Sequence, residues 1–287
     1  MNLIEITDLQ APELDIFSRM SEVQLYHYFE PEAGVFLAES ANVILRALEA
    51  GYEPLSLLLE HQRIETEGLP VMESIRERFG EEKAETLPIY TADHALVTQL
   101  TGYSLVRGLW AVMRRRPLPE PEDFCADKNR IAVLFDVVNP TNVGAIIRSA
   151  AALGVDGVLL TKGSVDPLTR RSARVSMGTV FQIPWTCADR LQSTGTRLIT
   201  DLHSLGFRTA AMALSDRSTG VDDPALASEE RLAIVLGSEG YGLPREVIDA
   251  CTYTVKIPMY HGVDSLNVAA ASAVVFWELG RRSLEAP

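Results

Sequence analysis

The stretch IAVLFDVVNPTNVGAIIRSAAALG, residues 131–154, decides the fold class of this 287-residue chain. It opens with a nearly continuous apolar run over 131–138, which is typical of a strand buried on both faces of a parallel sheet. Asn139-Pro140 ends that run, and the spacing predicts a helix over 142–153, stopped by a glycine. A buried strand followed by a crossover helix predicts an α/β fold with a mostly parallel sheet.

The same alternation continues towards the C-terminus. Further strands are predicted at 155–161, 180–184, 208–214, 232–236 and 253–257, and further helices at 167–175, 196–205, 244–250 and 265–279. Five or six strands joined by helices make an open, mostly parallel sheet with flanking helices.

A proline-rich stretch, RRRPLPEPED at 114–123, lies upstream of this pattern. Three prolines with alternating charge oppose both a helix and a central strand there. We therefore expect a domain at 1–115, a linker at 116–128 and a second domain at 129–287. The first domain is predicted to be a smaller α/β unit, helical over 1–30, with helices at 40–50, 70–79 and 91–99 and strands at 55–59 and 108–113.

Charge divides the chain in the same way. The net charge is −13, which taken alone argues against nucleic acid as a partner, because phosphate binding needs Lys and Arg. Residues 1–125 hold 22 acidic and 10 basic side chains, whereas residues 126–287 hold 17 and 16. The C-terminal part is thus almost neutral, and the total charge does not exclude RNA.

Several other classes are excluded. The sequence contains no apolar run of the roughly 18 residues that a membrane span needs. Its first residues carry acids and no basic segment, so a secretory signal is not expected. Three scattered cysteines form no metal set, which favours a reduced, cytoplasmic protein without a metal.

Three loops that follow predicted strands carry the candidate chemistry, because ligands of open α/β sheets bind at the carboxyl ends of the strands. They are NPTNVGAIIR at 139–148, LGSEGYGL at 236–243 and IPMYHGVDSLNV at 257–268. Neither GxGxxG after the first buried strand nor GxxxxGK[ST] occurs, so dinucleotide and P-loop sites fit poorly. Glycines in the second loop permit close backbone approach to a ligand.

Each position also has a purely structural interpretation. Asn142 is a good helix N-cap, and Arg148 on its own is an exposed helix cation. Glu239 is a solvated loop residue, and Ser265 is expected to cap the last helix. Asn267 is harder to explain in this way, because it begins an otherwise apolar helix where polar groups need partners.

Together the loops resemble the three motifs of the SpoU (TrmH-type) branch of the SPOUT RNA methyltransferases. The motifs are NxGxxxR at 142–148, LGSEGYG at 236–242, and IPM at 257–259 with SLNV at 265–268. They occur in the family's order, and the resemblance covers about residues 130–280. Residues 1–115 more loosely resemble the family's ribosomal-protein-like substrate-binding domain, mainly over 36–59 and 88–113.

The resemblance implies an S-adenosylmethionine-dependent RNA 2′-O-methyltransferase that works as a homodimer, with a deep trefoil knot in its C-terminal domain. By position, it implies a catalytic set of Asn142, Arg148, Glu239, Ser265 and Asn267, and cofactor contacts from Gly237, Gly240, Ile257, Met259 and Leu266. Two departures are small: Ser238 stands where many relatives have Asn, and Ala269 where Ser is common.

The proton of the ribose hydroxyl needs an acceptor. A guanidinium is always protonated, so we expect Arg148 to stabilise the developing alkoxide and hold a phosphate rather than act as the base. The proton then leaves through a substrate phosphate or water, with His261 as a minor alternative.

RNA contacts are predicted at Arg170, Arg171 and Arg174, which form a one-turn basic cluster, with a second cluster at Arg114–Arg116. Ribosomal RNA is favoured over transfer RNA only by family analogy, through the extra N-terminal domain. Two rival interpretations remain: a non-catalytic RNA-binding relative, and a small-molecule α/β enzyme that uses a dinucleotide.

Overall fold

The computed structural model describes residues 2–30, 34–101, 108–188, 195–215 and 217–280. Contacts divide the chain into two units: unit 1 comprises Met1–Pro117 with Leu168–Phe181, and unit 2 comprises Leu118–Pro167 with Gln182–Pro287. The chain therefore passes from unit 1 to unit 2, returns for one short segment, and passes to unit 2 again.

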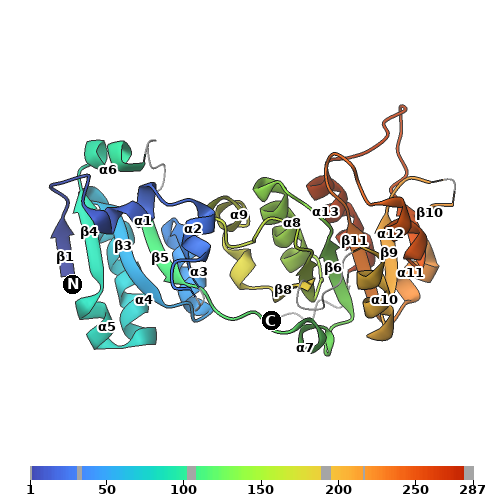
Figure 1. The fold of residues 1–287 in the computed structure, drawn as a ribbon, viewed down its shortest axis with the longest axis horizontal. Coiled ribbons are helices and arrows are strands. Elements are labelled where there is room, and N and C mark those ends of the chain that lie inside the picture. The colour runs from blue at the N-terminus through green and yellow to red at the C-terminus, as the bar shows by residue number, and fades with distance from the viewer. Residues whose placement is uncertain (1, 31–33, 102–107, 189–194, 216, 281–287) are drawn as a thin grey trace. The chain divides into compact units, whose positions relative to one another are not determined.

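Unit 2 is built on a seven-stranded sheet of order β10-β12-β9-β11-β6-β7-β8, in which every pair of neighbours is parallel (Figure 1). Its strands are β6 (Arg130–Leu134), β7 (Gly157–Leu160), β8 (Trp185–Cys187), β9 (Arg208–Met212), β10 (Thr219–Gly220), β11 (Leu232–Leu236) and β12 (Tyr253–Lys256). Its helices are α7 (Pro121–Cys125), α8 (Pro140–Ala152), α10 (Thr196–Ser204), α11 (Pro224–Ser228), α12 (Arg245–Ala250) and α13 (Val268–Leu279).

Both faces of this sheet are covered, as the apolar runs of β6 and β11 require. Alternate residues such as Ile131 and Val235 form one core with side chains from α7, α10 and α12. On α8 and α13, which pack against each other, Ile147 and Phe276 are buried. The buried Arg130 guanidinium donates to the carbonyl of Leu279 at 3.0 Å, which fastens the end of α13 to the sheet.

Unit 1 contains a mixed five-stranded sheet of order β1-β4-β3-β5-β2, in which β5 is antiparallel to both of its neighbours. The strands are β1 (Asn2–Glu5), β2 (Val35–Glu39), β3 (Pro54–Glu60), β4 (Pro88–Ala92) and β5 (Leu109–Arg114). The helices are α1 (Asp15–Ser18), α2 (Glu22–Tyr26), α3 (Ala41–Glu49), α4 (Leu69–Phe79), α5 (Glu81–Thr86), α6 (His94–Thr101) and α9 (Arg170–Val175), with short turns at Pro12–Leu14, His61–Arg63, Ile64–Gly68 and Thr179–Phe181.

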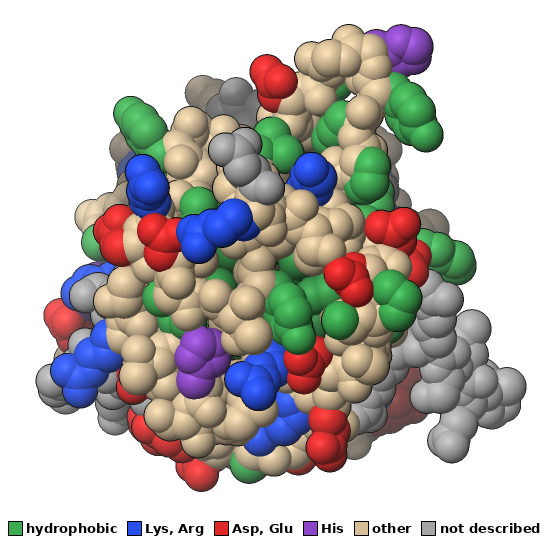
Figure 2. All heavy atoms as spheres, turned by 90° about the vertical axis from the view of Figure 1, so that its right-hand side faces the viewer, with side chains coloured by type: hydrophobic (Ala, Val, Ile, Leu, Met, Phe, Trp, Pro, Cys, Tyr) green, Lys and Arg blue, Asp and Glu red, His purple; other side chains and the backbone are tan. Residues whose placement is uncertain are grey.

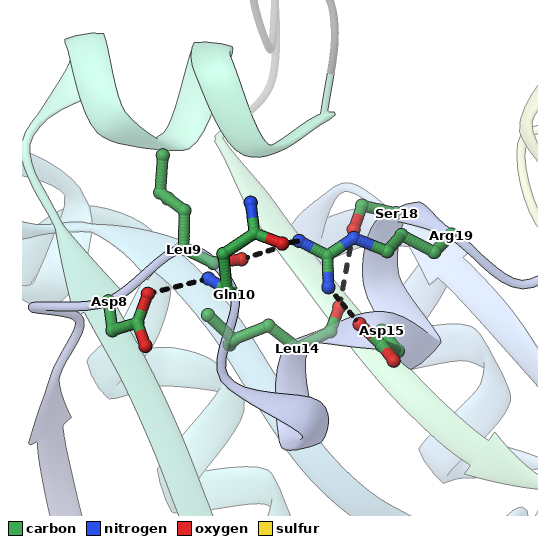
Figure 3. A network of polar contacts seen from close by, with 7 residues as sticks. All are labelled: Asp8, Leu9, Gln10, Leu14, Asp15, Ser18 and Arg19. Carbon is green, nitrogen blue, oxygen red and sulfur yellow. Dashed lines mark hydrogen bonds and ion pairs between the residues drawn. The ribbon is translucent and has the colours of Figure 1, made fainter.

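Arg19 holds the first connection of unit 1 in place (Figure 3). Its guanidinium donates to the Leu9 carbonyl at 2.9 Å and to Gln10 Oε1 at 3.0 Å, and it forms an ion pair with Asp15. Arg19 therefore helps to hold the segment between β1 and α1, together with the turn at Pro12–Leu14.

Several predicted elements differ from the structure. Residues 1–30, expected to be helical, contain β1 before their short helices, and the helix expected at 91–99 starts only at His94 because β4 occupies the residues before it. The strand expected at 180–184 is a 3₁₀ turn over Thr179–Phe181, followed by β8. Here Phe181 turns towards Phe36 of unit 1, with ring centroids 5.7 Å apart.

The stretch expected to be a linker, 116–128, contains α7. Pro121 occupies the first turn of that helix, where its missing N–H costs nothing. Phe124 and Cys125 are buried in the core of unit 2. The expectation that the prolines exclude a helix here is therefore wrong.

Candidate active site

The carboxyl ends of four neighbouring strands meet at one edge of the unit 2 sheet. The order β12-β9-β11-β6 makes these strands adjacent, and all four run parallel. The loops after β6, β11 and β12 are the three that the sequence singled out. Sheet topology thus brings together side chains that lie as far as 125 residues apart in the chain.

Three side chains form a hydrogen-bonded chain across these loops. Asn142 Nδ2 donates to Glu239 Oε1 at 2.5 Å, and Asn267 Nδ2 donates to Asn142 Oδ1 at 3.2 Å. The Oδ1 of Asn267 accepts the backbone N–H of Ala269 at 2.9 Å. Asn142 is only 7% exposed, and both ends of its amide are satisfied by this chain. Each amide is therefore held in one orientation by the next.

The helix caps differ from those expected. Asn139, not Asn142, caps α8, since its Oδ1 accepts a first-turn backbone N–H at 2.9 Å. Asn142 lies inside the first turn, so its amide is available to the loop after β11. Ser265 does not cap the last helix either, because α13 starts later and Asn267 is its cap. The expectation of an N-cap at Ser265 is wrong, and the alternative in which Asn142 is only an N-cap does not hold.

The glycines of the second loop let it fold back on itself. A Cβ on Gly237 would lie 2.4 Å from the carbonyl carbon of Gly242. The Gly242 N–H donates to the Ser238 carbonyl at 3.0 Å, and Gly242 has a φ of 66°. Only glycine meets both requirements without strain. At Gly237 the loop consequently packs backbone against backbone, with no side chain between.

A hollow of about 620 Å³ lies between this loop and the loop after β12, and we call it the donor hollow. Apolar side chains such as Leu236, Ile248 and Val255 line it, with charged groups that include Lys256. An apolar cavity with a few polar groups suits a flat ring system joined to a polar chain. Its lining includes eight residues that the sequence predicted: Gly237, Glu239, Gly240, Ile257, Met259, Ser265, Leu266 and Asn267.

The end of β9 also contributes to the donor hollow, which the sequence analysis missed. Met212, Ala213 and Leu214 line it because β9 lies between β11 and β12. The apolar run over 208–214 signalled the strand but not its neighbours. Strand order, which places these residues in the hollow, is a property of the whole sheet.

Arg148 stands apart from this cluster. It is exposed on α8 and, among the described residues, its guanidinium makes no hydrogen bond or ion pair. Six residues separate it from Asn142, which turns it about 240° around the helix axis. It is not among the residues that line the donor hollow of its own chain.

The predicted RNA-binding arginines Arg170, Arg171 and Arg174 lie in unit 1, on α9. With Glu39 they line a cavity of about 320 Å³ in unit 1. Arg174 Nη1 donates to the buried Glu39 carboxylate at 3.1 Å, and the Arg170 guanidinium lies 4.9 Å from the centre of the Trp110 ring. None of the three arginines is therefore free of contacts within the protein.

The second basic cluster, Arg114–Arg116, is engaged in the fold of unit 1. Arg114 pairs with Glu53 at 2.9 Å, and it holds the pKa of that carboxyl below its ordinary value together with Lys83, whose hydrogen bond has the larger effect. Arg115 is buried and lies over the Tyr26 ring at 4.7 Å. These contacts favour a structural role for the cluster over the predicted RNA contact.

The loop after β12 projects from unit 2, at the top of Figure 1. His261, in this loop, is exposed with a φ of 58° and is not among the residues lining the donor hollow. On the face of unit 2 shown in Figure 2, acidic and basic side chains are interspersed rather than gathered into a patch of one sign.

The described residues include no group of three metal-ligating side chains, and none of their helices is long and apolar enough to cross a membrane. All three cysteines are free thiols. Burial raises the pKa of both Cys125 and Cys251 to about 11, so neither is a thiolate near neutral pH. Cys125 and Cys251 are therefore poor candidates for a nucleophile.

Comparison with known proteins agrees with this arrangement. Residues 129–277 match the model of the SpoU rRNA Methylase family. An uncharacterized tRNA/rRNA methyltransferase of Mycobacterium bovis is 32% identical over 98% of this chain and 93% of its own length.

Solved structures resemble the whole chain. The AdoMet-bound rRNA methyltransferase of Sinorhizobium meliloti has a TM-score of 0.77 at 24% identity and covers 99% of both chains. An RNA 2′-O ribose methyltransferase has a TM-score of 0.70 at 24% identity, covering 96% of this chain and 98% of its own. With most of the motif residues gathered at one sheet edge and the family model matched over residues 129–277, this chain belongs to the SpoU rRNA Methylase family and is an RNA methyltransferase.

Proposed function

We propose that this protein transfers the methyl group of S-adenosylmethionine to a ribose 2′-hydroxyl of ribosomal RNA. The observation that carries the proposal is the donor hollow, whose edge holds the braced chain Glu239–Asn142–Asn267. Methyl transfer needs a donor and an acceptor held in line, and rigid placement alone supplies several kcal/mol of barrier reduction, on the order of 7 or more in favourable cases.

The residues of the hollow fit the donor. Bound S-adenosylmethionine supplies an activated methyl group on a sulfonium. The apolar lining accepts its flat adenine, and the folded-back loop at Gly237 offers backbone groups at close range. Glu239 provides a negative charge near the sulfonium, and Lys256 provides a positive one for a carboxylate.

The acceptor hydroxyl is positioned and its charge stabilised by the motif residues. Glu239 cannot swing freely, because Asn142 holds one of its oxygens. Arg148 stabilises the developing alkoxide and binds a neighbouring phosphate through two parallel hydrogen bonds. The proton leaves through a substrate phosphate or water, since a guanidinium does not accept it.

The working form is a homodimer. The outer face of α13 exposes Val274 at 40% and Trp277 at 70%, an apolar surface that a second copy would cover. α13 packs on α8, the helix that carries the exposed Arg148. Because Arg148 does not line the donor hollow of its own copy, we place its guanidinium at the hollow of the partner.

Residues 1–115 serve as the RNA-binding domain, joined in that role by Arg170, Arg171 and Arg174. Part of the acidity of this region is neutralised internally, through Glu39 with Arg174 and Glu53 with Lys83 and Arg114. The preference for ribosomal RNA rests on family analogy. Free cysteines fit a reducing compartment, so we place the protein in the cytoplasm.

The decisive experiment incubates the purified full-length protein with methyl-labelled S-adenosylmethionine and total RNA from cells that lack its gene. We expect label in ribosomal RNA, recovered after nuclease digestion as a 2′-O-methylnucleoside. Donor binding without transfer to any RNA would instead support a non-catalytic RNA-binding relative. Binding of NAD with no binding of S-adenosylmethionine would support the dinucleotide enzyme.

A further inference from the structure

A second hollow of about 560 Å³ lies beside the donor hollow in unit 2. The loop at 238–242 borders both hollows, so Glu239 contributes to each. The second hollow is completed by residues that follow β6, among them Asp136, Val138 and Asn139. None of the motif assignments gives this space a ligand. Its volume is that of a small-molecule site and exceeds what one nucleobase requires.

Two large apolar side chains are exposed in this hollow. Tyr241 is 98% exposed at the tip of the shared loop, between two glycines, and Val138 is 61% exposed. A tyrosine with no intramolecular packing contributes nothing to the core, whereas an aromatic face is a good surface for a nucleobase to stack on. The pairing of an aromatic and an aliphatic surface in one hollow suits a flat ring.

Asp136 is held in an unusual conformation in the same hollow. Its φ is 53°, a region that residues other than glycine rarely adopt. The Thr161 hydroxyl donates to Asp136 Oδ1 at 2.7 Å, and the Asp136 N–H donates back to Thr161 Oγ1 at 2.9 Å. A Cβ on Gly163 would lie 2.2 Å from Asp136 Oδ1. The carboxylate is therefore fixed, and its Oδ2 makes no hydrogen bond with the described residues.

The charge of the second hollow determines which part of a nucleotide can bind in it. Asp136 and Glu239 are its charged lining residues, and neither Lys nor Arg lines it among the described residues. Two carboxylates repel a phosphate, but a carboxylate accepts hydrogen bonds from N–H groups. The hollow thus disfavours the RNA backbone and suits a base whose edge carries N–H donors.

We propose that this second hollow seats the base of the acceptor nucleotide, with Tyr241 as the stacking surface and Asp136 as the hydrogen-bond acceptor. This inference rests on the proposed methyltransferase activity. The two carboxylates of the hollow, Asp136 and Glu239, together match a base that presents two adjacent N–H donors, which guanine does on its pairing edge. The shared loop would then border both the methyl donor and the base of the acceptor nucleotide, and its Glu239 lines both hollows.

The test uses the full-length protein, labelled S-adenosylmethionine and total RNA from cells lacking the gene. Tyr241→Ala is expected to raise KM for RNA about tenfold through lost stacking, while Tyr241→Phe stays within about twofold of wild type. The Kd for S-adenosylmethionine, measured by calorimetry without RNA, should change less than about twofold in both. Tyr260→Ala removes a similarly exposed tyrosine that borders neither hollow and is the matched control.

The methylated nucleoside identifies the base. Wild type is expected to give 2′-O-methylguanosine, and Asp136→Asn, which keeps an oxygen for Thr161 and tolerates the positive φ, should lower kcat/KM for that nucleoside about tenfold. Label in a base without adjacent N–H donors, or an unchanged KM in Tyr241→Ala, would overturn this inference while leaving the methyltransferase standing. Absence of label in any RNA with wild-type protein would remove the activity itself and this inference with it.

Discussion

At the scale of single residues, Asn142 organises the site. Its amide touches both the loop after β11, through Glu239, and the start of α13, through Asn267. An amide can do this because it carries a donor and an acceptor side by side. Sequence analysis selected Asn142, Glu239 and Asn267 from their motif positions, but the order in which they are bonded appears only in three dimensions.

Replacing Asn142 by Asp tests this brace. The change keeps the shape but turns the donor that faces Glu239 into a carboxylate, so two negative charges meet in a nearly buried place. We expect thermal unfolding to move to lower temperature and turnover to fall by about 100-fold or more, since a buried polar contact becomes repulsive. Asn139→Asp, at the cap of α8, retains its acceptor and should keep the unfolding temperature of the parent. Equal unfolding temperatures in the two variants would contradict the brace.

Arg148 carries the second prediction at this scale. Arg148→Lys keeps the charge but loses the planar fork, and we expect kcat to fall about 100- to 1000-fold, the cost of one oxyanion donor. Donor affinity should stay constant, because Arg148 does not line its own donor hollow. Single-turnover rates and calorimetry measure the two quantities separately. Near wild-type turnover would refute both a bidentate role and a role as base.

At the scale of elements, the apolar pattern predicted some strands correctly and missed others. β11 occupies the predicted residues, 232–236, because all five are buried on both faces. β2 was missed although its five residues are equally buried, since a short buried run looks the same in a helix and a strand. The donor hollow likewise includes residues at the end of β9, and no local sequence pattern could place them in it. Local sequence specifies an element, and the sheet specifies its neighbours.

The folded-back loop after β11 gives a prediction at this scale. Gly237→Ala places a Cβ against the Gly242 backbone, which cannot yield as a side chain can. We expect the loop to open and S-adenosylmethionine to bind at least about tenfold more weakly by calorimetry, since the loop forms one wall of the donor hollow. Gly240→Ala meets nothing within 4 Å and serves as the control for stability. Undiminished donor affinity in Gly237→Ala would show that the loop's close backbone approach is not needed for binding.

At the scale of the whole molecule, the charge that first opposed RNA is divided differently by the fold than by the sequence. Unit 1 holds 19 acidic and 13 basic side chains, because α9 brings it three arginines, and unit 2, which carries the site, holds 20 and 13. The trefoil knot implied by the resemblance stays a prediction, because strand order and pairing alone do not trace the threading of the chain. The assembly is the property that the sequence left to analogy, and the exposed face of α13 makes it testable.

Trp277→Glu places a charge on the apolar face of α13. We expect the wild-type protein to sediment as a dimer and the variant as a monomer without methyl transfer, because desolvating an unpaired carboxylate opposes association. Val23→Glu changes a similarly exposed residue of α2 and should leave the sedimentation coefficient unchanged. A Trp277→Glu variant that remains dimeric would place the interface elsewhere.

If Arg148 serves the partner copy, mixing Arg148→Ala with Gly237→Ala should restore part of the activity that each lacks alone.

The return of Leu168–Phe181 to unit 1 determines whether either unit can be removed without exposing the other's apolar side chains. A two-domain protein joined by one tether can lose or exchange either half as a cassette. Here an internal segment of the C-terminal part, Leu168–Phe181, packs with unit 1, where Phe181 lies beside Phe36. Deleting the first 117 residues would expose the apolar side chains of this segment to water. A fragment of residues 118–287 is therefore expected to be less soluble than the whole chain.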